Sequence, residues 1–137
     1  MNLPNSDTVY KFLLVFVGGA FGSTCRYAVT LLSIKLLGIN FPYGTMFVNL
    51  AGCFLIGVSF QLTEQVTWVS LSTRLFFMTG FLGGLTTFST FALETVIAGR
   101  KGNISIALIN FFANNALGML MVLAGVWLVQ YLIKGRT

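Results

Sequence analysis

The sequence predicts an all-α integral membrane protein in which four transmembrane helices form a single domain. Hydrophobic residues make up 56% of the 137-residue chain and charged residues only 8%. A soluble domain carries roughly 25% charged residues and needs them to cover its water-facing surface. The chain also has room for about four apolar spans of ~20–25 residues. Such a subunit is too small to enclose a wide pore alone, so we expect it to oligomerise.

Four apolar stretches can be bounded in order. They cover about residues 9–37, 44–62, 71–98 and 104–133. The connections between them, residues 38–42, 63–65 and 99–103, carry the Gly, Asn, Pro and charged residues that are typical of turns. A short polar N-terminus precedes the first stretch without a small-residue cleavage site, so this stretch is interpreted as a retained span. No composition shift divides the chain, and residues 1–137 are expected to form one domain.

The third span is expected to be broken. Its residues 83–91, with the sequence GGLTTFSTF, place two glycines, four hydroxyl side chains and two phenylalanines inside an apolar stretch. Irregular backbone at membrane depth is tolerated only where protein buries it or an aqueous path lies beside it. A functional site is therefore expected at this run.

Two pairs of glycines predict close contacts between helices. Gly18 and Gly22 form a pair in the first span, and Gly80 and Gly84 form another in the third. Small residues four positions apart let helix backbones approach each other closely in a membrane.

The positive charges are almost equally divided between the two membrane sides. One side receives Lys11, Arg74, Lys134 and Arg136, and the other receives Lys35, Arg100 and Lys101. An excess of positive charge on the cytoplasmic side normally sets orientation. A near balance would allow insertion both ways and antiparallel pairing, although a fixed orientation set by the C-terminal charges remains open. Because these charges lie near the ends of the spans, the net charge of +5 does not indicate nucleic-acid binding.

Several classes of chemistry are excluded by residue type. The chain contains no histidine, which removes histidine metal sites, Ser-His-Asp triads and histidine proton relays. Cys25 and Cys53 form no CxxC pair and are interpreted as small residues in apolar segments. The glycines of residues 80–84 lack both the Rossmann spacing and a Walker lysine. We therefore do not expect an enzyme.

Two ionisable residues lie inside the spans. Arg26 is near the middle of the first span and Glu94 is in the third. Such groups cost at least ~2.5–3.5 kcal/mol at membrane depth, so they usually face a cavity or a partner. Arg26 either satisfies backbone carbonyls freed by the broken helix or attracts anions. Glu94 is either an interfacial carboxylate or part of a site.

Polar and aromatic residues recur on one face of three different spans. These faces are Thr45 with Asn49, then Phe88, Phe91 and Glu94, then Asn110 with Asn114. Interhelical hydrogen bonds and ordinary aromatic packing would explain any one face. All three together predict a narrow polar track. Amide and hydroxyl donors, with the positive edges of phenyl rings, suit a small anion and bind it weakly enough to release it.

The sequence contains three notable motifs: residues 80–91 (GFLGGLTTFSTF), residues 18–22 (GGAFG) leading to Arg26, and residues 44–49 (GTMFVN). Together they resemble the Fluc fluoride channel family, also called CrcB. The resemblance covers essentially the whole chain after the first ten residues. It implies an antiparallel, dual-topology homodimer in the bacterial inner membrane, with two fluoride pores and a structural Na⁺ at the dimer interface. By position, backbone carbonyls of Gly83 and Thr86 would hold that Na⁺.

The resemblance also implies roles for residues along the pore. Asn49, Phe88 and Phe91 match pore positions, and Ser89, Thr90, Thr45 and Glu94 match positions in or near the polar track. In the fourth span, where family members often carry Tyr or Ser, this chain has Asn110 and Asn114.

The expected function is a passive, fluoride-selective channel that exports cytoplasmic fluoride and so limits its toxicity. The alternative is a small dual-topology, proton-coupled exporter of drugs or cations, which would be expected to use a carboxylate in its first span. That span contains Arg26 and no carboxylate. A third alternative, a non-transporting accessory subunit, leaves the three polar faces unexplained.

Overall fold

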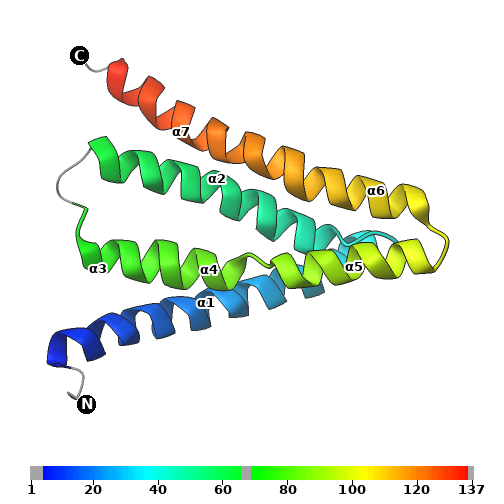
Figure 1. Ribbon diagram of the computed structural model, residues 1–137, viewed down its shortest axis with the longest axis horizontal. Helices are drawn as coiled ribbons and strands as arrows, with labels where there is room; N and C mark the ends of the chain where they lie inside the picture. Colours follow the sequence, from blue (N-terminus) through cyan, green and yellow to red (C-terminus); the bar gives the residue numbers. More distant parts are fainter. Residues whose placement is uncertain (1–4, 66–68, 136–137) are drawn as a thin grey trace.

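A computed structural model describes residues 5–65 and 69–135 of the chain. Four long helical spans lie side by side (Figure 1), and each is long and apolar enough to cross a membrane. The spans are Ser6–Leu37, Tyr43–Gln65, Leu71–Arg100 and Ile104–Lys134. The prediction of an all-helical protein with four membrane spans is therefore confirmed. Arg136 lies outside the described residues.

The first two spans are continuous α-helices. Helix α1 (Ser6–Leu37) begins where the Asn5 side chain accepts a hydrogen bond of 2.9 Å from the Thr8 N–H. It ends at Gly38, whose φ of +80° lies in the left-handed region that glycine adopts without strain. Helix α2 (Tyr43–Gln65) then returns antiparallel to α1. Because four spans alternate in direction, both ends of the described chain lie at the left in Figure 1.

The third span consists of four segments. Helix α3 (Leu71–Arg74) leads into a π-helical segment, η1 (Leu75–Leu82), which continues into the short α4 (Gly83–Leu85). Helix α5 (Phe88–Arg100) completes the span. The two residues between α4 and α5, Thr86 and Thr87, have extended backbone with ψ of 157° and 115°. This extended pair is visible in Figure 1 between the two green helical stretches.

The fourth span contains a π-helical segment within its length. Helix α6 (Ile104–Phe112) is followed by the π-helical segment η2 (Ala113–Leu117) and then by α7 (Gly118–Lys134). A π-turn inserts an extra residue and so changes which side chains face a neighbouring helix. Here it lies beside the extended pair of the third span.

Glycines allow α1 to pack closely against the third span. A Cβ atom on Gly18 would overlap the carbonyl oxygen of Phe76, and one on Gly22 would overlap that of Phe81. A Cβ on Gly84 would lie 2.5 Å from the Gly19 carbonyl oxygen. The predicted contacts of the two glycine pairs are confirmed. We call this contact, formed by Gly18, Gly22, Gly80 and Gly84, the glycine seam.

The outer surface is strongly apolar. Large side chains such as Phe12 and Phe16 are more than 70% exposed, and the buried core is small, centred on Val48, Leu82 and Leu85. In water this distribution would be unfavourable, whereas lipid chains solvate such side chains readily. The chain is therefore a multi-pass membrane protein, and its small core lies next to the extended pair.

Candidate functional site

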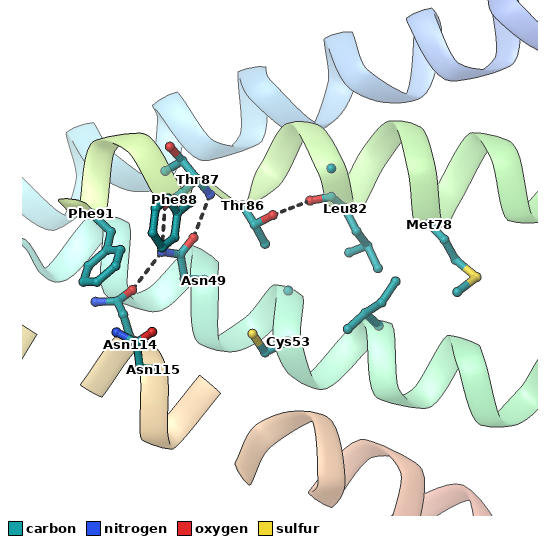
Figure 2. Close-up of a pocket in the computed structure, with 13 residues that line it drawn as sticks. Asn49, Cys53, Met78, Leu82, Thr86, Thr87, Phe88, Phe91, Asn114 and Asn115 are labelled. Carbon is teal, nitrogen blue, oxygen red and sulfur yellow. Dashed lines mark hydrogen bonds between the residues drawn. The ribbon is translucent and has the colours of Figure 1, made fainter. Parts of the chain in front are cut away.

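A cavity of about 360 Å³ lies between α2, the third span and η2. Figure 2 shows its lining, in which Asn49 of α2 and Asn114 of η2 face Thr87 and the two phenylalanines of α5. We call it the amide cavity. It brings together Asn49, Gly83, Thr86, Phe88, Phe91 and Asn114, six of the residues that the sequence indicated.

The Asn49 side chain takes the place of the hydrogen-bond partners that the Thr87 backbone would have in a continuous helix. Its Oδ1 accepts a hydrogen bond of 2.8 Å from the Thr87 N–H, and its Nδ2 donates one of 3.1 Å to the Thr87 carbonyl. An unbroken α-helix would direct the Thr87 N–H to the carbonyl of Gly83, four residues earlier. Both backbone polar groups of Thr87 are therefore paired with one side chain, and the Gly83 carbonyl loses its usual donor.

Thr87 also caps helix α5. Its hydroxyl accepts a hydrogen bond of 3.2 Å from the N–H of Thr90, the usual role of a threonine at a helix N-terminus. In an unbroken helix this N–H would point to the carbonyl of Thr86. The carbonyls of Gly83 and Thr86 thus both lose their helical donors, because Thr87 and Asn49 take those donors instead.

Three asparagine side chains form a continuous chain of hydrogen bonds that begins at the cavity wall. Asn49 Nδ2 donates to Asn114 Oδ1 at 2.8 Å (Figure 2), and Asn114 Nδ2 donates to Asn110 Oδ1 at 2.9 Å and to the Asn110 carbonyl at 3.0 Å. Asn110 is only 1% exposed. Its Nδ2 donates to the hydroxyl of Thr95 at 2.9 Å and to the Phe91 carbonyl at 3.4 Å. The two fourth-span asparagines therefore join one network.

The two phenylalanines of α5 have very different surroundings. Phe91 is 4% exposed and Phe88 is 76% exposed. Their rings meet edge to face, with centroids 5.5 Å apart and planes at 68°. This geometry turns the positive edge of one ring toward the negative face of the other. Phe91 is part of the core of the subunit, whereas Phe88 projects beyond it.

Thr45 and Glu94 meet at a second, larger cavity of about 610 Å³, near the 38–42 loop. The Thr45 hydroxyl donates a hydrogen bond of 2.8 Å to Glu94 Oε1, and Thr45 is nearly completely buried. Glu94 Oε2 is buried and has no hydrogen-bond partner among the described residues. Lys101 also lines this cavity, which we call the charged cavity.

Three other predicted site residues, Thr90, Ser89 and Arg26, are not among the residues that line the two cavities. Thr90 is half-buried and bonded to Thr87, while Ser89 is exposed, with one long contact of 3.5 Å to the same residue. Arg26 is half-buried, and its side chain makes no hydrogen bond or ion pair within residues 5–65 and 69–135, while its backbone carbonyl accepts from the Thr30 hydroxyl at 3.0 Å. Within that part of the chain it does not satisfy any carbonyl of the third span.

Two residues of the network were missed by sequence reasoning. In the sequence Thr87 is one hydroxyl in a polar run, although a Thr directly before a helical stretch is a typical cap. Thr95 is four residues after Phe91, and its hydroxyl donates to the Phe91 carbonyl at 2.9 Å. A single threonine in an apolar helix gives no other signal, because such hydroxyls commonly bond to their own helix.

Comparisons with known proteins agree on one family. The family model described as "CrcB-like protein, Camphor Resistance (CrcB)" matches residues 13–126. A protein of Parabacteroides distasonis named "Fluoride-specific ion channel FluC" is 40% identical over 90% of this chain and 95% of its own length. Proteins of the same name from Acidobacterium capsulatum and Rhizobium etli are 43% and 42% identical. They cover 84% and 88% of this chain, and 92% and 97% of their own lengths.

Proposed function

The chain belongs to the CrcB-like family, and we propose from this membership that it is a fluoride-selective, passive ion channel. The observation that carries the proposal is the match to proteins named as fluoride-specific channels at about 40% identity over nearly their whole lengths. The family is one of channels rather than enzymes, and no catalytic activity is proposed.

The amide cavity has the chemistry that such a channel needs. Asn49 and Asn114 carry N–H groups, Thr86 and Thr87 carry hydroxyls, and Phe88 with Phe91 carries ring edges. An entering anion would compete for the amide and hydroxyl donors with their present protein acceptors. No lysine or arginine is among the described residues that line it. Neutral donors replace part of the water shell of a small anion without holding it tightly, as conduction requires. A fixed positive charge at the same place would favour trapping.

The direction of transport follows from the membrane potential. Hydrogen fluoride crosses membranes as a neutral acid and releases fluoride in a less acidic cytoplasm. A potential of 100 mV, negative inside, favours the exit of one negative charge by about 2.3 kcal/mol. A passive channel in the bacterial inner membrane would therefore lower cytoplasmic fluoride, and we propose that this limits its toxicity.

We also propose that the chain, as one integral-membrane domain, forms an antiparallel homodimer with two pores and a structural Na⁺ at the dimer interface. Support comes from the 76% exposure of Phe88, which a second subunit would cover, and from the nearly equal charges of the two membrane sides. The residues suit a sodium ion, because Na⁺ prefers oxygen ligands. Gly83 and Thr86 would hold it through the carbonyls whose helical donors are diverted.

Efflux from liposomes tests the function. The purified protein would be reconstituted into vesicles loaded with fluoride, and release would be followed with a fluoride electrode after a potassium ionophore is added. We expect fast fluoride release, and no chloride release from matched vesicles loaded with chloride. Fluoride release no faster than that from protein-free vesicles would refute the proposal.

A further inference from the structure

The direction of the hydrogen bonds along the asparagine chain is fixed at the Asn49 end. A backbone N–H only donates and a carbonyl only accepts, so the two hydrogen bonds to Thr87 fix which end of the Asn49 amide faces which group. The second Asn49 N–H then points to Asn114, which must present its oxygen. In turn Asn114 donates to Asn110, and Asn110 donates to Thr95. Each amide orientation is therefore favoured by the one before it, and the Asn110 carbonyl, which accepts from Asn114 Nδ2 at 3.0 Å, favours the same orientation of Asn114.

At the other end, beyond Asn110, the direction of the hydrogen bonds is not fixed. It ends on the hydroxyl of Thr95, which accepts from Asn110 Nδ2 and donates to the Phe91 carbonyl. A hydroxyl can donate or accept toward the same neighbour by rotating its hydrogen. Thr95 can thus support either polarity of Asn110, whereas the Thr87 backbone supports one polarity of Asn49.

In the observed arrangement the cavity offers an anion few free donors. Both N–H groups of Asn49 are engaged, one with the Thr87 carbonyl and one with Asn114 Oδ1. An anion that takes the second N–H would meet the lone pairs of Asn114 Oδ1, which repel it. The anion gains a second amide donor only if the Asn114 amide turns over.

We propose that an anion binding between Asn49 and Asn114 reverses the hydrogen bonds from Asn114 to Thr95. This inference rests on the proposed fluoride conduction. Asn114 Nδ2 turns to the anion and its Oδ1 turns to Asn110. Asn110 then donates through Nδ2 to Asn114 and accepts through Oδ1 from the Thr95 hydroxyl. Asn110 and Thr95 act as positioning residues, since neither touches the anion.

The reversal costs the 3.0 Å hydrogen bond from Asn114 Nδ2 to the Asn110 carbonyl, which keeps its backbone donor, the Ala113 N–H. The other main polar groups stay paired. Thr95 exchanges its bond to the Phe91 carbonyl for one to Asn110, and that carbonyl keeps its place in the helical hydrogen bonds of α5. The 3.4 Å contact from Asn110 to the same carbonyl is long and is lost at small cost. Two amide N–H groups gain an anion instead, and hydrogen bonds to a charged group are roughly twice as strong as neutral ones. When the anion leaves, the neutral chain closes again, which favours release.

Replacing the Thr95 hydroxyl tests the reversal. Thr95→Val keeps the shape of the side chain but can neither donate nor accept, whereas Thr95→Ser keeps the hydroxyl. The matched control is Thr24→Val, because the Thr24 hydroxyl donates at 2.8 Å to the Ala20 carbonyl of its own helix, away from the cavity. We expect Thr95→Val to lower fluoride efflux by about tenfold, because Asn110 Oδ1 has no donor in the bound state, whereas Asn110 Nδ2 keeps the Phe91 carbonyl as an acceptor in the resting state. Thr95→Ser and Thr24→Val should conduct like the wild type.

A second measurement reports the reversal directly. In wild-type protein with ¹⁵N-labelled asparagine, fluoride titration should shift the side-chain amide signals of Asn49, Asn114 and Asn110 together. In a folded Thr95→Val protein the Asn110 signal should stay unshifted. Efflux from Thr95→Val equal to that from Thr95→Ser would overturn the reversal, as would an Asn110 signal in the wild type that fluoride leaves unchanged. Absence of fluoride efflux from the wild type itself would instead refute the proposed function.

Discussion

The glycine seam and the amide cavity lie on opposite faces of the same stretch of the third span, and they are built in opposite ways. At the seam, Gly18 and Gly22 remove side chains so that backbones touch. At the cavity, Asn49 and Asn114 add side chains that replace missing backbone partners. One face fixes the position of the span in the subunit, and the other supports its extended residues. The difference predicts that substitutions at the seam mainly lower the stability of the protein, whereas substitutions at the cavity mainly lower fluoride conduction.

The largest effect is expected at the seam. In Gly22→Ala, the new Cβ would overlap the Phe81 carbonyl and approach the Leu85 nitrogen, so the helices must separate. We expect the free energy of unfolding in detergent to fall by about 3 kcal/mol, the upper range for an overpacked contact. Gly19→Ala is the matched control, because the nearest heavy atom to its Cβ would be 3.8 Å away. Equal thermal stability of these two variants would contradict close packing at the seam.

The second largest effect, a loss of fluoride efflux, is expected for a substitution of Asn49. Asn49→Asp keeps an oxygen for the Thr87 N–H but loses both N–H groups and brings a negative charge into the cavity. We expect fluoride efflux to fall by about 100-fold or more, because repulsion of the anion adds to the loss of two donors. The readout is efflux per folded protein in liposomes. Efflux within a few-fold of the wild type would remove Asn49 from the path.

Substitutions of Phe88 and Phe91 should separate an effect on conduction from an effect on stability. Phe88→Leu changes a side chain that is 76% exposed in the subunit, and Phe91→Leu changes one that is 4% exposed. If Phe88 lines a pore in the dimer, its variant should lose fluoride efflux while the thermal unfolding temperature stays the same. Phe91→Leu should lower both, by about 1 kcal/mol or more of stability for the imperfect fit. A Phe88→Leu protein with unchanged efflux would place that ring against lipid.

The smallest effect is expected at the charged cavity. Thr45→Val removes the hydroxyl that donates to Glu94 Oε1, leaving both carboxylate oxygens without a described donor. We expect fluoride efflux to fall by about three- to tenfold, the range for one hydrogen bond. Thr45→Ser should restore it because the hydroxyl returns. A loss in Thr45→Ser as large as in Thr45→Val would show that the shape of the side chain matters rather than its hydrogen bond.

The spans and the glycine contacts could be predicted because they depend on local pattern. Length and hydropathy predict the four helices, and a spacing of four residues predicts that Gly18 and Gly22 face the same neighbour. The same spacing predicted that Asn110 and Asn114 share a face. They do lie together, joined by a hydrogen bond of 2.9 Å.

The pairing of Asn49 could not be predicted in the same way. Its partners, Thr87 and Asn114, are 38 and 65 residues away in sequence, so the contacts depend on how three helices pack. The sequence therefore predicted Asn49 as a donor but not that its donors are already in use. Thr95 was missed for a related reason. Its importance comes from a buried neighbour on another span, Asn110, and not from its own helix.

The most direct test of the central claim, that the amide cavity conducts fluoride, compares two proteins in parallel. Equal amounts of folded wild type and Asn49→Leu would be reconstituted into fluoride-loaded liposomes, and efflux would be recorded with a fluoride electrode. Fast release from the wild type, with release from Asn49→Leu close to that of protein-free liposomes, is the predicted result. Equally fast release from both proteins would contradict the claim, because fluoride would then cross without the amide that pairs with Thr87.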